Sequence, residues 1–230
     1  MKKIVYSVIF ASLLLMSLFT QNIYAEIVTN TTEGNHLFTS KFEKVNGQSC
    51  TAVALSDTSF LTAAHCVDRN NQESYIGKVF PALSGIQTPL SSIDIDKATV
   101  YSPRNLDSKK DFAILKGKNP PQSMKYYLTN NAVKIKVVDD LQSLIGKKVY
   151  TIGYPKDTEA KYQDKKEGTI QKIDSGVILT DNITGSGSSG GGLYLEETNE
   201  LIGIVSGKGI GLSHFAPITS DIKNWIDKNK

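Results

Sequence analysis

The sequence predicts an all-β fold, and two observations support this prediction. Short runs of alternating or wholly apolar residues recur along the chain after residue 26. Turn-forming Gly, Pro, Asn and Asp residues separate these runs, as in sandwiches and barrels built from many short strands. Examples of the expected strands are 51–55, 60–64, 112–115, 133–138, 149–154, 169–173, 177–179, 193–195 and 201–205.

Two short segments are expected to be helical. Residues 63–67 should form one turn after a strand, and residues 220–228 a longer helix. Ser220 is the expected N-cap of the longer helix, and Asp221 lies in its first turn. Its apolar face would consist of Ile222, Trp225 and Ile226. Pro120-Pro121 is the best candidate for a boundary between two halves of the chain.

Residues 1–25 have the layout of a secretory signal peptide. A Lys-Lys start precedes an apolar run over residues 4–19, and Ala25 precedes the expected cleavage site, which leaves Glu26 first. The alternative is a membrane anchor. The run is short compared with the roughly 20 residues that span a bilayer, and Ser and Thr interrupt it. We therefore expect a secreted chain with no stable membrane association after cleavage.

The composition is that of an ordinary globular protein, with 40% hydrophobic and 21% charged residues in a chain of 230. This length allows one domain or two small ones. The net charge is +3, and loss of the two N-terminal lysines leaves +1. Such a nearly neutral chain gives no indication of nucleic-acid binding.

The chain contains two cysteines, Cys50 and Cys66. An even number of cysteines in an exported chain indicates a disulfide, although two reduced and buried thiols are the alternative.

Residues 185–192 read GSGSSGGG and form the most unusual segment. A flexible linker is one interpretation, but only 38 residues follow, and they begin at once with a strand-like run. The other interpretation is functional. Glycines allow backbone N–H groups to approach a ligand, and a serine in such a turn could attack a substrate carbonyl whose oxyanion those groups stabilise.

A serine nucleophile needs a base, and the chain has three histidines: His36, His65 and His214. His65 ends an apolar run beside Cys66, which would hold its imidazole rigidly, although a purely structural histidine is the alternative. Asp111 opens another apolar run and could orient this base. A turn aspartate without a catalytic role, or the nearby Asp107, remains possible.

Taken together, these motifs resemble those of the chymotrypsin-like serine peptidases. Residues 62–66 (TAAHC) resemble the histidine motif of that family, 111–115 (DFAIL) its aspartate motif, and 187–191 (GSSGG) its nucleophile motif. They occur in the family order His, Asp, Ser, and the spacing of the two cysteines is similar to that of the family disulfide. The resemblance covers almost all of residues 26–230.

The resemblance implies a fold and a site. The fold would be two six-stranded antiparallel β-barrels, at about residues 26–120 and 121–230, with a C-terminal helix. These together would form one peptidase domain. The catalytic residues would be His65, Asp111 and Ser189, and the N–H groups of Gly187 and Ser189 would form the oxyanion hole. The resemblance implies protein or peptide substrates, a monomer, and no metal or cofactor.

Further segments resemble the V8-like glutamyl endopeptidases of Gram-positive bacteria, with the Spl proteases and exfoliative toxins as relatives. These segments are 153–155 (GYP), 168–170 (GTI) and 184–185 (TG). The substrate-binding residues implied are Thr184, Val205, Ser206, Lys208 and His214. The resemblance favours an acidic or polar uncharged side chain before the cleaved bond.

The chain also departs from the family at particular positions. Ser188 stands where an Asp or Asn usually precedes the nucleophile, and Gly192 stands where proline is common. The subfamily's substrate-binding histidine would fall near Val205. Ile183 carries no charge, so a preference for Lys or Arg is not expected.

Two other functions fit parts of the sequence. Residues 187–191 also fit the nucleophile pattern of α/β-hydrolases, with His214 downstream, but that fold needs a helix directly after the serine and many parallel βα units. A non-catalytic or conditionally active homologue that binds a host protein is the second alternative. The presence of His65, Asp111 and Ser189 argues against it.

Overall fold

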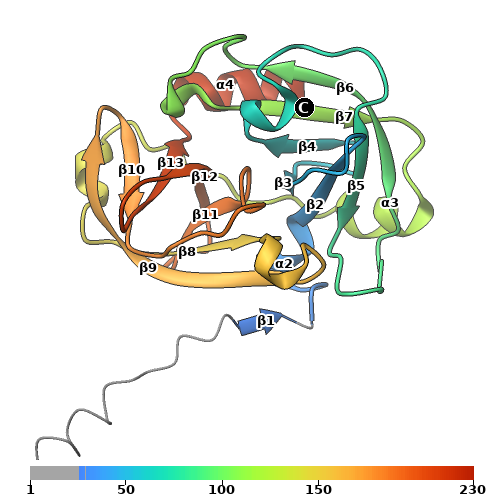
Figure 1. The fold of residues 1–230 in the computed structure, drawn as a ribbon, viewed down its shortest axis with the longest axis horizontal. Helices are drawn as coiled ribbons and strands as arrows, with labels where there is room; N and C mark the ends of the chain where they lie inside the picture. Colours follow the sequence, from blue (N-terminus) through green and yellow to red (C-terminus); the bar gives the residue numbers. More distant parts are fainter. Residues whose placement is uncertain (1–25, 29) are drawn as a thin grey trace, which may run out of the picture.

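The computed structural model describes residues 26–28 and 30–230, which form two closed β-barrels (Figure 1). The strands of the first barrel are β2 (Thr39–Lys44), β3 (Ser49–Ala54), β4 (Ser59–Thr62), β5 (Gly77–Pro81), β6 (Ile93–Val100) and β7 (Ala113–Gly117). They pair antiparallel in the order β2-β3-β4-β7-β6-β5, and β5 closes the barrel on β2.

The second barrel follows in the chain. Its strands are β8 (Lys148–Gly153), β9 (Gln163–Asp174), β10 (Val177–Thr180), β11 (Gly192–Leu195), β12 (Leu201–Lys208) and β13 (Ser213–Pro217). The order is β9-β10-β13-β12-β11-β8, and the pairing of β8 with β9 closes it. A further strand, β1 (Glu26–Val28), pairs with β9. The predicted all-β class with two six-stranded antiparallel barrels is therefore confirmed.

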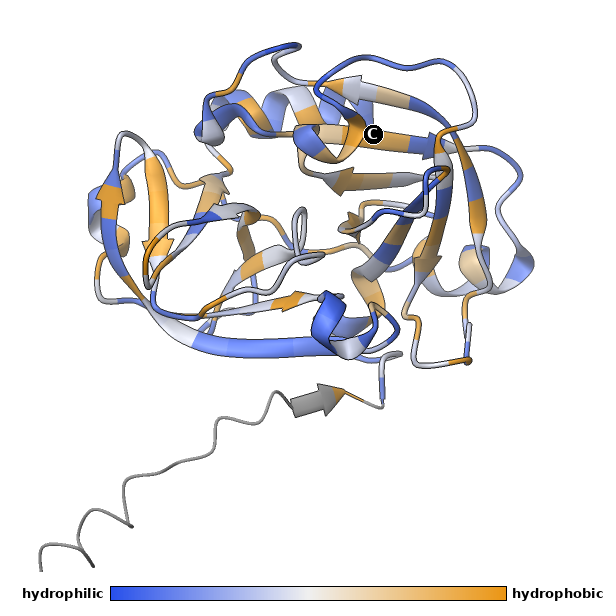
Figure 2. Ribbon diagram, in the orientation of Figure 1, coloured by the Kyte–Doolittle hydropathy of each residue, from blue (hydrophilic) through white to orange (hydrophobic). Residues whose placement is uncertain are grey.

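Two apolar cores lie inside and between the barrels, and Figure 2 shows the apolar residues concentrated along the strands. Strand β8 is buried on both faces, since Val149 belongs to the core of the second barrel while Tyr150 and Ile152 belong to the larger core that fills the first. Successive side chains of a strand point to opposite faces. The outer face of β8 thus packs the second barrel against the first.

Helices are few and short. They are α2 (Gly34–Phe38), α3 (Gln122–Leu128) and α4 (Ser220–Asn229), with the 3₁₀ turns η1 (Ala64–Val67), η2 (Ser108–Lys110), η3 (Leu141–Leu144) and η4 (Lys156–Thr158). The turn predicted at 63–67 corresponds to η1. Helix α4 buries Ile222 and Ile226 in the larger core, and Trp225 makes an edge-to-face contact with Tyr101 at 5.4 Å. The C-terminus thus returns to the first barrel (Figure 1).

The predicted N-cap of α4 was wrong. Thr219 is the N-cap residue and its side chain makes no capping bond, while Ser220 is the first residue of the helix. The carboxylate of Asp139 accepts hydrogen bonds from the Ser220 N–H, at 2.9 Å, and from its hydroxyl. An acceptor from a distant loop therefore satisfies a free N–H of the first turn, which local sequence cannot reveal.

The predicted strand at 133–138 was also wrong. Ile135 forms one isolated parallel bridge with Leu201, and the segment runs as extended chain beside β12. Five strands are not among the predicted examples: β1, β2, β5, β6 and β13. In β5 and β6 the buried residues are interspersed with lysine and aspartate, and β2 has two lysines among its six residues, so the apolar content of these strands is low.

The predicted signal peptide at 1–25 lies outside the described residues. Among the helices that the structure describes, none has both the length and the apolar character needed to span a bilayer.

Cys50 and Cys66 are joined by a disulfide, as predicted, between β3 and η1. The bond closes a loop with a sequence separation of 16 residues, and loops of this size contribute about 3 kcal/mol to stability in the chain-entropy model. We therefore expect reduction to lower the free energy of unfolding of the folded protein by about this amount. Urea unfolding with and without a reductant measures it.

The double variant Cys50→Ala/Cys66→Ala is the control for this disulfide prediction. It should match the reduced protein in stability, and the reductant should not change it further. An equal effect of the reductant on both proteins would contradict the assignment of the effect to this bond.

Candidate active site

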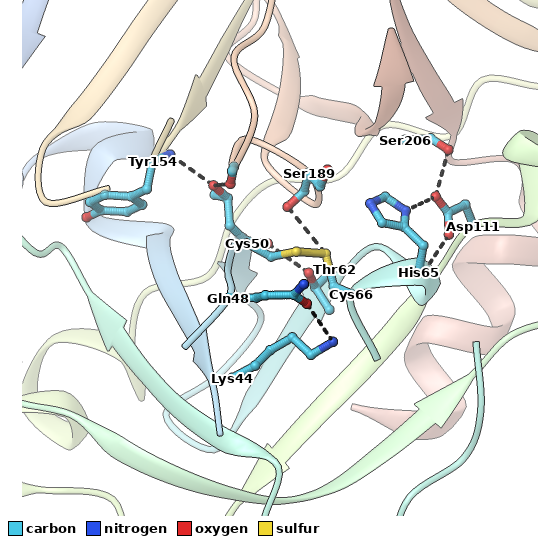
Figure 3. The surroundings of a disulfide bond; sticks show 12 residues. Lys44, Gln48, Cys50, Thr62, His65, Cys66, Asp111, Tyr154, Ser189 and Ser206 are labelled. Carbon is cyan, nitrogen blue, oxygen red and sulfur yellow. Dashed lines mark hydrogen bonds and ion pairs between the residues drawn. A yellow bond between two sulfur atoms is a disulfide. The ribbon is translucent and has the colours of Figure 1, made fainter. Parts of the chain in front are cut away.

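His65 is held at the junction of β4 and η1. Strand β4 is buried along its whole length, and Cys66 is tied to β3, so the backbone on both sides of His65 is fixed. Its side chain remains 31% exposed, and its Nδ1 lies 2.6 Å from Oδ2 of Asp111 (Figure 3). The first barrel therefore leaves part of this imidazole exposed to solvent, while Asp111 fixes the ring at Nδ1.

Asp111 lies between η2 and β7 and is completely buried. Besides Nδ1 of His65, its carboxylate accepts hydrogen bonds from the His65 backbone N–H at 2.9 Å and from the Ser206 hydroxyl at 2.7 Å. Nη1 of Arg69 completes the set at 3.1 Å. Ser206 belongs to β12, so a residue of the second barrel shares the carboxylate with residues of the first.

The carboxylate of Asp111 is ionised in this environment. Burial alone raises its pKa, but the hydrogen bond and charge of His65, the Ser206 hydroxyl and the His65 backbone N–H together hold the pKa below its usual value. An ionised carboxylate only accepts hydrogen bonds, so Nδ1 of His65 carries the proton that it donates. When the ring carries only this proton, Nε2 is the nitrogen that can accept another.

The Gly/Ser segment forms a tight loop rather than a linker. Gly187 and Gly190 have φ values of +101° and +84°, which favour glycine. A Cβ on Gly190 would lie 2.3 Å from the Thr51 carbonyl oxygen, and a Cβ on Gly187 would lie 2.6 Å from that of Tyr154. Side chains are excluded at both positions because the backbone of the first barrel and that of the 154–156 segment approach so closely.

The two serines of the loop differ in exposure. Ser188 is only 5% exposed and packs against Gly153, where an added Cβ would lie 3.1 Å from the Ser188 Oγ. Ser189 is partly exposed, and its carbonyl oxygen lies 3.8 Å from Sγ of Cys66, the residue after His65. Ser189 is therefore the loop serine positioned beside the imidazole segment (Figure 3).

Two N–H groups of the loop have no acceptor among the described residues. The Lys156 N–H donates to the Ser186 carbonyl at 2.7 Å, and the peptide is trans, so the Gly187 N–H points away from Lys156. Among the described residues, neither this N–H nor that of Ser189 donates to a protein acceptor. Two uncommitted N–H groups on either side of Ser188 can bind a developing oxyanion.

The family follows from a match over most of the chain. The family model described as Trypsin matches residues 28–226. The chain belongs to the trypsin family. No curated protein sequence matches it significantly.

Solved structures share the fold of this trypsin-family chain at low identity. A structure of a Glu endopeptidase in complex with MPD is 20% identical with a TM-score of 0.73, covering 88% of this chain and 94% of its own. The thermostable serine protease AL20 from an extremophilic microorganism is 15% identical, with a TM-score of 0.68 and coverage of 86% and 100%. The scabies mite inactivated protease paralogue S-I1 is 18% identical, with a TM-score of 0.67 and coverage of 84% and 96%.

The residues expected to bind substrate are spread over different surroundings. Thr184 is buried, where its N–H donates to Oγ of Ser213 at 2.8 Å and its hydroxyl lies 3.1 Å from the same atom. Val205 is buried, and the Ser206 hydroxyl is committed to Asp111. Lys208 is exposed at the end of β12.

His214 lies opposite Gly207 in the pairing of β12 with β13, but its side chain faces away from the buried Ser213. Its neighbours in β13, Ser213 and Phe215, are buried, so His214 points to the opposite face of the strand. There it borders a cavity of about 360 Å³ lined by Lys172, Asp174, Ser175, Val177, Leu179, Gly209, Ile210, Leu212 and His214. Ser189 does not line this cavity.

A metal centre does not fit the residues near His65. A ring nitrogen of His65 lies within 4.8 Å of the sulfurs of Cys50 and Cys66. Both sulfurs are joined in the disulfide, and the cysteine ligand of a metal is a thiolate.

Sequence reasoning missed three contacts of the site: those of Arg69 and Ser206 with Asp111, and that of Thr51 with the nucleophile loop. Arg69 follows His65 by four residues, so a position of Arg69 close to the candidate site could have been inferred from the sequence. The other two contacts join the barrels, and only the folded chain brings them together.

The lowered pKa of Asp111 predicts how stability depends on pH. A carboxyl group whose folded pKa lies below its unfolded value of about 3.9 stabilises the protein above that pH, and this contribution is lost as the pH falls through the folded pKa. We expect the unfolding free energy to fall more steeply below about pH 4 in the native protein than in Asp111→Asn. Urea unfolding over this range measures it.

The control for the pH prediction is Asp94→Asn, which removes a carboxylate paired with Lys78 at the surface. It should leave the pH dependence close to that of the native protein. If Asp111→Asn does the same, the ionised carboxylate is not a source of the acid sensitivity.

Proposed function

We propose that the protein is a secreted serine endopeptidase that hydrolyses peptide bonds with His65, Asp111 and Ser189. One observation carries the proposal most strongly. The buried Asp111 carboxylate binds Nδ1 of His65 at 2.6 Å, while the loop that bears Ser189 has two N–H groups that donate to no acceptor in the described part of the chain. The family supports the reaction class, and the disulfide and the signal-like residues 1–25 support secretion. We take the chain from residue 26 as one peptidase domain, divided near Pro120-Pro121.

The proposed reaction proceeds through an acyl-enzyme. Nε2 of His65 takes the proton from the Ser189 hydroxyl as its oxygen attacks the scissile carbonyl. The charge that develops on the carbonyl oxygen is stabilised by the N–H groups of Gly187 and Ser189, and Asp111 stabilises the imidazolium. His65 then protonates the leaving amine, the C–N bond breaks, and water, activated by His65, hydrolyses the ester on Ser189.

Replacement of Ser189 tests the proposed nucleophile. Ser189→Ala should lower kcat by a factor on the order of 10⁴ to 10⁶, because it removes the attacking oxygen. The fold should persist, since the side chain is partly exposed and only one hydroxyl is lost. Hydrolysis of a peptide substrate and labelling by a serine-directed phosphonate measure the loss, and thermal unfolding checks the fold.

Ser188→Ala is the matched control for this replacement. It removes the neighbouring hydroxyl, which packs against Gly153 away from solvent, and it should retain labelling and turnover. The reverse pattern would assign the nucleophile to Ser188. A native protein that neither reacts with the phosphonate nor cleaves peptides would favour the non-catalytic homologue.

We also propose a preference for an acidic or polar uncharged side chain before the cleaved bond. Thr184 and Ser213 place two hydroxyls together in the buried interior beside the loop. A carboxylate bound there without a cation would be costly, so acidic selectivity needs a positive group. Lys208 lies two residues after Ser206 and is the nearer candidate along β12, while His214 points to the other face of β13.

Cleavage of a peptide library tests this preference. Lys208→Ala should lower kcat/KM for peptides with Glu at the cleaved bond by about tenfold or more, because it removes one charge-assisted hydrogen bond, and should affect neutral peptides little. His214→Ala should change neither. A strong Glu preference that survives both changes, or an outright preference for aromatic or aliphatic residues, would contradict this account of the pocket.

A further inference from the structure

Thr51 connects the first barrel to the nucleophile loop through both its backbone and its side chain. It is fully buried in β3. Its N–H donates to the Ser189 carbonyl at 2.8 Å, and its hydroxyl donates to the Gly187 carbonyl at 2.9 Å. The same hydroxyl accepts from the Tyr154 N–H at 2.9 Å, and the Thr51 carbonyl accepts from the Thr62 hydroxyl at 2.8 Å.

These bonds fix the peptides on both sides of Gly187. Its own carbonyl is held by the Thr51 hydroxyl. The preceding carbonyl, that of Ser186, is held by the Lys156 N–H, and Lys156 lies two residues after Tyr154, which Thr51 also holds. Glycine has no Cβ to restrict its dihedral angles, so external bonds must set the orientation of its N–H.

The side chain of Ser188, which lies between the two proposed oxyanion donors, contributes little to the orientation of the Gly187 N–H. Ser188 carries no charge, and its side chain packs against Gly153. Its backbone N–H donates to the Gly185 carbonyl at 3.1 Å, a bond within the loop itself. The restraint imposed by Thr51 comes instead from the opposite barrel.

We propose that Thr51 is a positioning residue whose hydroxyl holds the peptides on both sides of Gly187, so that the Gly187 N–H stays directed at the developing oxyanion. The hydroxyl holds the Gly187–Ser188 peptide directly and the Ser186–Gly187 peptide through the 154–156 segment. This inference rests on the proposed function. Thr51 does not touch the reacting atoms. It acts on them through Gly187, and its two hydrogen-bond functions, donation to Gly187 and acceptance from Tyr154, use one hydroxyl group.

The chemistry of the hydroxyl defines the variants that test it. Thr51→Val keeps the shape of the side chain and removes both hydrogen bonds, whereas Thr51→Ser keeps the hydroxyl and removes only a methyl group. Thr151→Val is the matched control, because Thr151 is a buried threonine of β8 whose hydroxyl has no partner among the described residues. Thr51→Ala is the second hydroxyl-free variant if Thr51→Val does not fold.

The expected result separates positioning from folding. Thr51→Val should lower kcat by about 10- to 1000-fold, where the upper limit is the effect of losing one oxyanion donor. Its KM should stay within about threefold of the native value. Activity is calculated per active site titrated with the phosphonate. A peptide aldehyde forms an adduct with Ser189 that places an oxyanion in the hole, so the affinity of Thr51→Val for the aldehyde should fall by a similar factor. The affinity of Thr51→Val for a non-covalent product peptide should not change. Thr51→Ser and Thr151→Val should resemble the native protein.

Crystal structures of the variants supply a readout that does not depend on activity. In Thr51→Val the Gly187 carbonyl should leave its native direction, and in Thr51→Ser it should keep it. An unchanged loop in Thr51→Val, or native kcat per titrated site, would overturn the positioning role. If the native protein itself does not react with the phosphonate, the proposed function fails, while a rotated loop in Thr51→Val would still support the restraint by Thr51.

Discussion

The buried carboxylate of Asp111 is the constraint on which the rest of the site depends. An ionised carboxyl group without partners would be too costly to bury, and four hydrogen bonds from His65, Arg69 and Ser206 offset that cost. The donors come from both barrels. The orientation of the His65 ring and the placement of β12 are therefore set by the same group, and a shift of one barrel against the other would leave a buried charge unsatisfied.

The nucleophile loop depends on the first barrel in a similar way. The Thr51 carbonyl and the Thr62 hydroxyl lie so close to Gly190 that a side chain there would clash with both. The Gly190 N–H donates to the Val205 carbonyl at 2.8 Å. The loop is thus held between β3 and β12, one strand from each barrel. Glycines that would give a flexible linker in an exposed chain here allow a close approach that fixes the backbone.

The all-β class could be predicted from local patterns of strands and turns. The two barrels and the candidate site residues followed from the resemblance carried by the motifs around His65, Asp111 and Ser189. The errors arose where distant residues decide the structure. Asp139 caps α4 in place of Ser220, and the 133–138 run lies beside β12 through a single bridge instead of joining a barrel. A strand such as β6, with alternating buried and polar residues, owes its place to its neighbours as much as to its own composition.

The contacts between the barrels explain why part of the site was beyond sequence reasoning. Thr51 and Gly187 are 136 residues apart, and Ser206 and Asp111 are 95 apart. A threonine in a strand is an ordinary β residue, and nothing in its neighbours shows that its hydroxyl has a partner in the other barrel. Each of these bonds leaves buried polar groups unpaired when it is broken, at a cost of about 1–3 kcal/mol. Because the same bonds orient His65 and the Gly187 N–H, the free energy that holds the barrels together is also what holds the proposed catalytic groups in place.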